Sequence, residues 1–230
     1  MKSQKITNFE KTPEKRWYDD ACGTALALEL VGERWSLLIV RELMFGGRRF
    51  SELRSGLPGI SANILTQRLE GLERVGIVQR RKLPPPASIQ IYELTPWGYE
   101  AEIILQELGR WATRSPLHDP TLPLSAASVM MSFRTMYSAA RAGGEAATIG
   151  FRFGDDVFVV DFGPDGIHTR RAEPEKCRLV VSANPMSLAS VVYGGRPVLD
   201  AEASGELTLA GDSALFDRFV GWFPLPEKLA

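Results

Sequence analysis

Three short side chains that both donate and accept hydrogen bonds lie close together in the N-terminal half of this 230-residue chain. They are Asn63, Thr66 and Gln67, and Ser61 stands just before them. Side chains of this kind can bind the edges of bases in the major groove of DNA. The chemistry they suggest is recognition of a surface, without breaking or forming a covalent bond.

Catalytic and metal chemistry find little support in the other polar residues. The two histidines, His118 and His168, lie fifty positions apart and without metal-ligand spacing to a cysteine or carboxylate pair. The adjacent Asp155 and Asp156 fit a turn better than a catalytic pair. The chain has neither a phosphate-binding glycine loop nor a Gly-x-Ser-x-Gly elbow. We therefore expect no enzymatic activity, no metal and no cofactor.

Basic residues gather around the three polar side chains. The formal net charge is only −1, yet residues 48–82 hold eight basic and three acidic residues. A charge run alone is more often a solvated face, but inside a DNA-binding element it indicates contacts with phosphates. The expected DNA-contacting residues are Arg48, Arg49, Ser51, Ser61, Asn63, Thr66, Gln67, Arg68, Arg80, Arg81 and Lys82.

Residues 46–95 contain the elements that must position these side chains. Ser51 is expected to cap a first helix, which Leu57-Pro58-Gly59 ends. Ser61 then caps a second helix, residues 61–75. Ile64, Leu65, Leu69 and Leu72 form its apolar stripe, which leaves the polar residues exposed.

Two strands follow the second helix, at residues 77–82 and 89–92, joined by a proline-rich loop. A helix-turn-helix followed by a β-hairpin is a winged helix, in which the second helix enters the major groove. Before it, residues 21–31 and 35–45 predict two more helices, and the second is apolar enough to form the core of this unit.

Many short motifs, in order, resemble the HxlR-type winged-helix regulators over residues 20–114. They are Cys22, Gly32-Glu33-Arg34-Trp35, Arg41-Glu42-Leu43, Arg49-Phe50-Ser51-Glu52-Leu53, Pro58-Gly59-Ile60-Ser61, Leu65-Thr66-Gln67-Arg68-Leu69, Tyr92-Glu93-Leu94-Thr95 and Gly98. The resemblance implies a dimeric bacterial transcription factor. We expect it to bind double-stranded DNA at a palindromic operator. Some relatives use a cysteine at the position of Cys22 to sense oxidants or electrophiles. Asp19 and Asp20, nearby, are expected to raise the pKa of that thiol.

A helix is expected from Thr95-Pro96 to about residue 114. Trp97, Ile104, Leu108 and Trp111 share one stripe on it. We expect this stripe to form a homodimer seam, because helix-turn-helix proteins bind paired half-sites as two-fold dimers. Packing against the C-terminal half is the alternative.

The chain divides into four parts by composition. Residues 1–16 predict a flexible arm, residues 17–114 the winged-helix and dimerisation domain, residues 115–124 a proline-rich linker, and residues 125–230 a second domain. The second domain predicts helices at 125–141, 186–193 and 213–222, with strands at 148–153, 157–162, 167–171, 178–182 and 206–210. The fold class is α+β in two domains, the first mostly helical with a β-hairpin wing.

Residues 126–224 resemble the sterol-carrier-protein-2-like fold. The residues that carry this resemblance are Cys177-Arg178-Leu179-Val180-Val181-Ser182-Ala183, Ser187-Leu188-Ala189, Gly194-Gly195-Arg196, Ala203-Ser204-Gly205-Glu206-Leu207, Ala210-Gly211-Asp212, Phe216 and Phe219. The resemblance implies an α+β sandwich with a mixed or antiparallel sheet and an apolar tunnel. The expected ligand-binding residues are Met130, Phe133, Tyr137, Phe151, Phe158, Tyr193, Phe216, Phe219 and Trp222. Aromatic and methionine side chains in such number suit a small hydrophobic effector, although simple core packing is the alternative.

The sequence therefore predicts a regulator, more specifically a repressor, whose second domain binds an effector that changes operator binding. One alternative keeps the DNA-binding role and places the signal at Cys22. Another is a lipid carrier whose winged helix makes protein contacts. The polar N-terminus without an apolar segment, and two cysteines in different halves, predict a cytoplasmic protein without a membrane span.

Overall fold

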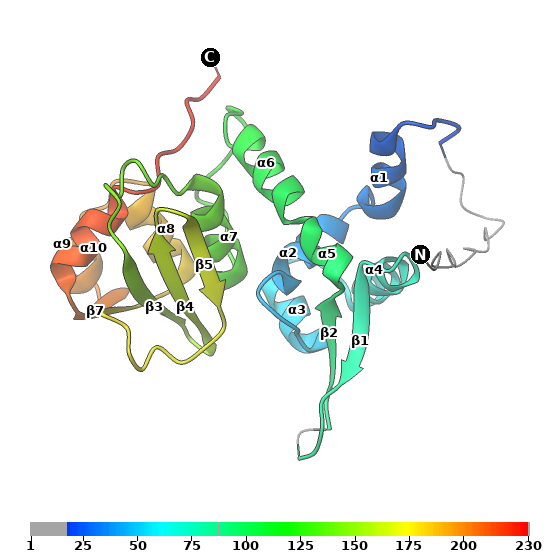
Figure 1. Cartoon of the computed structure of the whole chain (residues 1–230), viewed down its shortest axis with the longest axis horizontal. Coiled ribbons are helices and arrows are strands. Elements are labelled where there is room, and N and C mark those ends of the chain that lie inside the picture. Colours follow the sequence, from blue (N-terminus) through cyan, green and yellow to red (C-terminus); the bar gives the residue numbers. More distant parts are fainter. Residues whose placement is uncertain (1–17, 87, 230) are drawn as a thin grey trace, which may run out of the picture.

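The computed structural model describes residues 18–86 and 88–229, which form two halves joined by a stretch without helix or strand at residues 113–125 (Figure 1). The predicted arm at residues 1–16, and Trp17, lie outside the described residues. Helices and strands occur in both halves, so the predicted α+β class is confirmed.

The first half is a winged helix, as predicted. Its elements are α1 (Gly23–Val31), α2 (Ser36–Leu43), α3 (Phe50–Gly56), α4 (Ala62–Arg74), β1 (Val78–Lys82), β2 (Gln90–Leu94), α5 (Pro96–Glu100) and α6 (Glu102–Ala112). The wing strands are antiparallel, with Val78 opposite Leu94. Ile39, Val40 and Leu43 of α2 are fully buried, which confirms this helix as the core of the unit.

Two boundaries in this half differ from the prediction. Helix α3 begins at Phe50 with Arg49 at the N-cap, so Ser51 lies inside the helix and does not cap it. The cause is a pair of backbone hydrogen bonds between Arg48 and Tyr92, each 2.8 Å, which hold the chain extended until just before Phe50. The single helix expected at residues 95–114 is divided at Ala101 into α5 and α6.

The second half consists of one sheet covered by helices. Its elements are α7 (Ala126–Met136), β3 (Ala147–Phe153), β4 (Asp156–Gly163), β5 (Gly166–Arg170), β6 (Leu179–Ala183), α8 (Pro185–Val192), α9 (Val198–Ala203), β7 (Leu207–Gly211) and α10 (Ser213–Val220). The strand order is β5-β4-β3-β6-β7, and β3 runs parallel to β6, so the sheet is mixed. The expected alternation on β3 is confirmed, because Ile149, Phe151 and Phe153 are buried.

Two helices of this half differ from the prediction. Helix α7 ends at Met136 instead of continuing to residue 141, because the backbone turns at Tyr137 and the amide of Ser138 donates to the carbonyl of Trp222, 2.9 Å away. The short helix α9 was not predicted, although Pro197 stands at its N-cap position. Six residues carry too little periodicity to indicate a helix.

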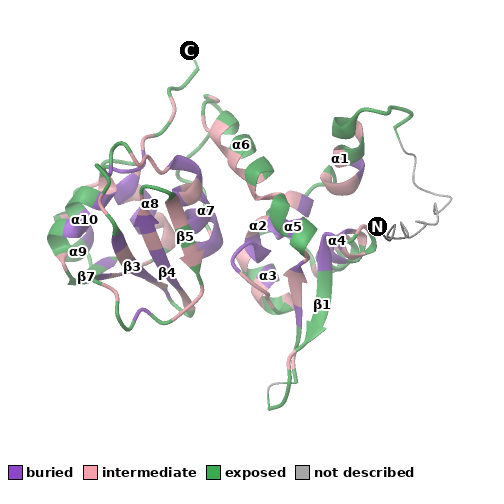
Figure 2. Cartoon of the chain, viewed as in Figure 1, coloured by how far each residue is buried: buried purple, intermediate pink, exposed green. Residues whose placement is uncertain are grey.

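The buried side chains of the two halves form one continuous cluster rather than two separate cores. Buried residues line the facing sides of α2 and α7 in Figure 2. At the contact, the ring of Phe45 meets that of Phe158 edge to face, with centroids 5.8 Å apart. The halves are therefore packed against each other by apolar contact.

Among the residues that the structure describes, no helix has the length and apolar character needed to cross a membrane.

Candidate nucleic-acid interface

Helix α4 presents the three polar side chains as the sequence predicts. The Ser61 hydroxyl accepts a hydrogen bond from the amide of Ile64, 3.3 Å away, and so caps the helix. Leu65, Leu69 and Leu72 are buried, whereas Asn63, Thr66 and Gln67 are exposed. The helix is held by its apolar side and offers donors and acceptors on the other.

The turn before α4 is also formed locally. Glu52 accepts a hydrogen bond from the backbone amide of Arg49, 2.8 Å away, and so satisfies the start of α3. Gly59 has a φ of 89°, a conformation that suits glycine in the turn between α3 and α4. Arg49 and Ser51 are both exposed near this turn, where they can reach a phosphate.

Arg68 is held back against the protein. Its guanidinium forms an ion pair with Glu33 at 2.9 Å, and its Nε donates to the carbonyl of Arg34 at 3.0 Å. The side chain is 23% exposed. Arg68 therefore braces α4 against the segment before α2, and a contact with DNA would compete with that role.

The wing carries three exposed cations. Arg80 pairs with Glu73 at 2.9 Å and Arg81 with Glu93 at 2.8 Å, whereas Lys82 has no ion-pair partner among the described residues. Exposed ion pairs contribute at most about 1 kcal/mol. A phosphate can therefore replace either carboxylate at little cost, and all three residues stay in the expected set.

Arg48 requires a correction. Its guanidinium forms two hydrogen bonds with the carboxylate of Asp156 in the second half, at 2.7 and 2.9 Å, and its side chain is 13% exposed. Arg171 pairs with the same carboxylate. Arg48 is not free for a phosphate in this structure, because it joins the two halves of the chain.

The predicted dimer seam is exposed. Trp97, Ile104, Leu108 and Trp111 have exposed fractions between 42% and 72%, and Ile103 is exposed by 67%. Ile103, Ile104, Glu107 and Leu108 line a surface hollow of about 430 Å³. The opposite side of α6 packs on α7, where Arg110 donates to the carbonyl of Thr135. The C-terminal half therefore does not cover the predicted stripe, which was the alternative considered from sequence, but packs on the other side of α6.

The two cysteines have opposite environments. Cys22 is exposed at the start of α1, and hydrogen bonds from the backbone and side chain of Thr24 and the backbone of Ala25 lower the pKa of its thiol. The expected raising of that pKa by Asp19 and Asp20 was wrong: Asp20 instead accepts a hydrogen bond from the Cys22 amide at 2.9 Å. Burial raises the pKa of Cys177, which is partly covered.

The nine predicted ligand-binding residues pack against one another. Eight are aromatic and one is Met130, and seven of the nine are buried. The ring centroid of Phe133 lies 5.6 Å from Phe151 and 5.3 Å from Phe219, and Phe223, which was not predicted, lies 4.6 Å from it. In this structure these side chains fill the space between sheet and helices, so they form a core and not an open site.

Polar atoms at the contact between the halves were not predicted as a group. Glu42, Asp156 and Arg171 lie there together with Arg48. The sequence contained one sign of this polar contact, because the charged residue Glu42 interrupts an apolar helix. Within the described parts of the chain, no three His, Cys, Asp or Glu side chains are close enough to hold a metal ion.

Comparison with known proteins agrees with the winged helix. Residues 30–118 match the family model described as HxlR-like helix-turn-helix. The uncharacterized HTH-type transcriptional regulator YvaP of Bacillus subtilis (strain 168) is 41% identical over 88 residues, which are 38% of this chain and 81% of that protein. The HTH-type transcriptional regulator YodB of the same organism is 41% identical over 86 residues, 37% of this chain and 77% of that protein. The solved reduced form of YodB is 38% identical, covers 40% of this chain and 92% of its own, and has a TM-score of 0.38.

Proposed function

This chain belongs to the HxlR-like helix-turn-helix family, and we propose that it is a bacterial transcription regulator that reads an operator with helix α4. The observation that carries the proposal is the exposed triad Asn63, Thr66 and Gln67 on a capped helix with a buried apolar side. These groups can bind base edges, while Arg49 and the wing cations bind phosphates on either side.

We propose further that the regulator is a homodimer on a palindromic operator. The exposed apolar face of α5 and α6 supports this, because removing large apolar side chains such as Trp97 and Trp111 from water at an interface is energetically favourable. Two copies related by a two-fold axis would present two α4 helices to successive major grooves. Repression is the direction we propose, since a bound dimer can block transcription without contacting the polymerase.

Binding of DNA in general is tested with a pool of random duplexes. Each phosphate contact releases counterions, so the affinity should fall steeply between about 50 and about 200 mM salt. Lys82→Ala should lower the salt slope by about 1, whereas Lys176→Ala, an exposed lysine of the second half, should leave it unchanged. A protein that binds no duplex at the lower salt concentration would refute the proposal.

The second part of the proposal is that a small-molecule effector changes the affinity of the regulator for its operator. An effector changes operator affinity only if it binds one arrangement of the dimer more tightly than another. The sterol-carrier-protein-2-like resemblance suggested a hydrophobic effector inside the second half, but such a ligand would have to displace packed rings such as Phe133 and Phe219. The same packing speaks against the lipid-carrier alternative.

Redox control is the second candidate, and the exposure and lowered thiol pKa of Cys22 favour it. A thiolate is the form that reacts with oxidants and electrophiles. If this candidate is right, oxidant changes the DNA affinity of the wild-type protein and has no effect on Cys22→Ser. A Cys22→Ser protein that still responds would remove it.

A further inference from the structure

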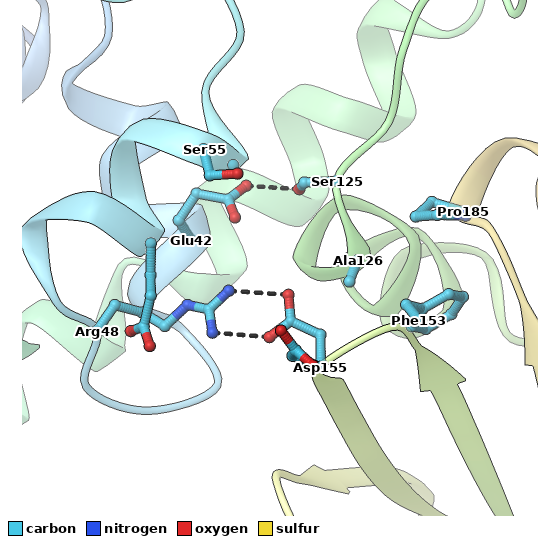
Figure 3. A pocket seen from close by; sticks show the side chains of 11 residues that line it. Glu42, Arg48, Ser55, Ser125, Ala126, Phe153, Asp155 and Pro185 are labelled. Carbon is cyan, nitrogen blue, oxygen red and sulfur yellow. Dashed lines mark hydrogen bonds and ion pairs between the residues drawn. The ribbon is translucent and has the colours of Figure 1, made fainter.

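We propose that the cavity between the winged helix and the second half binds a small organic cation, an amine or amidine on a short apolar body. The cavity measures about 390 Å³, within the range of about 300–1,000 Å³ usual for small-molecule sites. Both halves line it (Figure 3). Its residues are Glu42, Arg48, Glu52, Ser55, Gly56, Ser125, Ala126, Phe153, Asp155, Asp156 and Pro185.

The main attraction for a cation is a buried carboxylate with a free oxygen. Glu42 is 1% exposed, and its Oε1 accepts hydrogen bonds from Ser125 at 2.7 Å and from two nitrogens of Arg41 at 2.8 and 3.1 Å. No described residue donates to Oε2, which Figure 3 shows directed between the two halves. Among the described residues, the fully covered side-chain atoms without a hydrogen-bond partner do not include Oε2, so this oxygen stays open to the cavity. An N–H group that reaches it can form a charge-assisted hydrogen bond.

The room around this oxygen depends on a glycine. A Cβ at Gly56 would lie 2.6 Å from Glu42 Oε2, well inside the contact distance. Any other residue at position 56 would push the carboxylate or occupy its side of the cavity. Gly56 therefore keeps Oε2 accessible from the cavity.

Two further carboxylates in the lining are also open acceptors. Asp155 is exposed and has no ion pair with a described residue, and Glu52 uses only one oxygen for the backbone of α3. The carboxylate of Asp156, in contrast, is occupied by two arginines. The unpaired nitrogens nearby, such as Arg48 Nε, are fully covered and out of a ligand's reach. The Ser55 hydroxyl, which can donate or accept, also lines the cavity, but the carboxylates of Glu42, Glu52 and Asp155 offer acceptors only. This excess of open acceptors favours a cation over an anion.

One wall of the cavity is apolar. Phe153, Ala126 and Pro185 line it, and Figure 3 shows the Phe153 ring on the side opposite Glu42. A ligand that places its nitrogen near Glu42 can therefore pack a short hydrocarbon or aromatic group against this wall. These contacts define the ligand class as a compact amine or amidine with an apolar body.

A bound cation would contact both halves of the chain next to the ion pair between Arg48 and Asp156. It would favour this arrangement over others that separate Glu42 from Asp155. The effect on DNA rests on the proposed function, but the binding itself does not.

The test is isothermal titration calorimetry of the full chain with benzylamine and benzamidine, with benzyl alcohol as the neutral probe and benzoate as the anion. The two cations should bind one site per chain, and the other two probes should not. Glu42→Gln should weaken cation binding about tenfold or more, since a hydrogen bond to a charged group is lost. Asp155→Asn should weaken it several-fold, whereas the matched Asp165→Asn, exposed in the turn between β4 and β5, should not change it.

Equal binding of benzyl alcohol, no saturable binding of either cation, or full affinity in Asp155→Asn would overturn the proposal. Asp155→Asn decides the matter even if Glu42→Gln fails to fold, because Asp155 is exposed and outside the core. Cation binding without DNA binding would remove the proposed function and keep this site. DNA binding without cation binding would remove only this site.

Discussion

Arg48 of the winged helix and Asp156 of the second half form a two-bond ion pair, with NH1 2.7 Å from Oδ1 and NH2 2.9 Å from Oδ2. Arg171 donates to the same carboxylate and lies over the ring of Phe158, 4.4 Å from its centroid. One carboxylate thus pairs with two partly buried guanidinium groups across the contact between the halves. Its removal would leave both guanidinium groups without this ion pair.

We expect Asp156→Ala to lower the free energy of unfolding by about 3 kcal/mol, because breaking one side of a largely buried pair leaves charge uncompensated. Urea unfolding measures this change. Glu173→Ala is the matched control: its pair with Arg152 is 42% and 60% exposed, so a loss below about 1 kcal/mol is expected. Equal losses in the two variants would show that the bridge contributes no more than a surface pair.

The same carboxylate should make stability depend on acid pH. Burial alone would raise the pKa of Asp156, but the hydrogen bonds from Arg48 and the charge of Arg171 outweigh it and hold the pKa below its ordinary value. The unfolded chain therefore takes up this proton first, near pH 3.9, and the stabilisation present above that pH is lost as the pH falls further.

The measurement compares urea unfolding of the wild type and Asp156→Asn from pH 7 to pH 3. The difference in stability should be constant down to about pH 5 and should shrink below about pH 4. A difference that stays the same throughout would show that Asp156 does not carry a depressed pKa.

Short local motifs in the sequence were enough to predict much of the winged helix. Ser61 and Thr95 each cap a helix through a contact three residues away, so short motifs predict them. Ser51 failed as a cap because the start of α3 is set by Arg48, whose backbone pairs with the distant wing residue Tyr92. A cap motif cannot report a pairing that depends on the folded wing.

The contact between the halves could not be predicted in the same way. Arg48 and Asp156 stand 108 positions apart, and a single sequence does not show which of many charged residues meet. The sequence therefore indicated that Arg48 is a basic residue near a DNA-binding element. It did not indicate that the Arg48 guanidinium forms an ion pair with Asp156. The packed interior of the second half was likewise hidden, since aromatic residues suit either a core or a pocket.

Trp111→Asp should separate the proposed dimer. Trp111 is exposed by 72% on α6, and a carboxylate placed in an apolar interface costs more than the remaining contacts can offset. Sedimentation velocity should show a dimer for the wild type and a monomer for the variant. Leu199→Asp, equally exposed on α9 of the second half, should leave the dimer intact. A wild-type monomer would refute the proposed dimer, and a dimer that tolerates Trp111→Asp would place its interface elsewhere.

The two thiols should react at different rates with a disulfide reagent such as 5,5′-dithiobis(2-nitrobenzoic acid). Cys22 is exposed with a lowered pKa and so holds more thiolate at pH 7, whereas burial raises the pKa of Cys177. We expect a fast and a slow phase, with the fast phase missing in Cys22→Ser and retained in Cys177→Ser. A fast phase that survives in Cys22→Ser would assign the reactive thiol to Cys177.

The measurement that tests the central claim most directly is selection of bound sequences from a random duplex library, followed by sequencing. The account predicts an enriched palindrome whose half-sites lie about one helical turn apart, because two α4 helices read successive major grooves. Asn63→Ala/Gln67→Ala should relax this preference at defined base positions, while Glu202→Ala, on exposed α9, should leave it unchanged. No enriched motif, or the same motif from the double variant, would contradict the account.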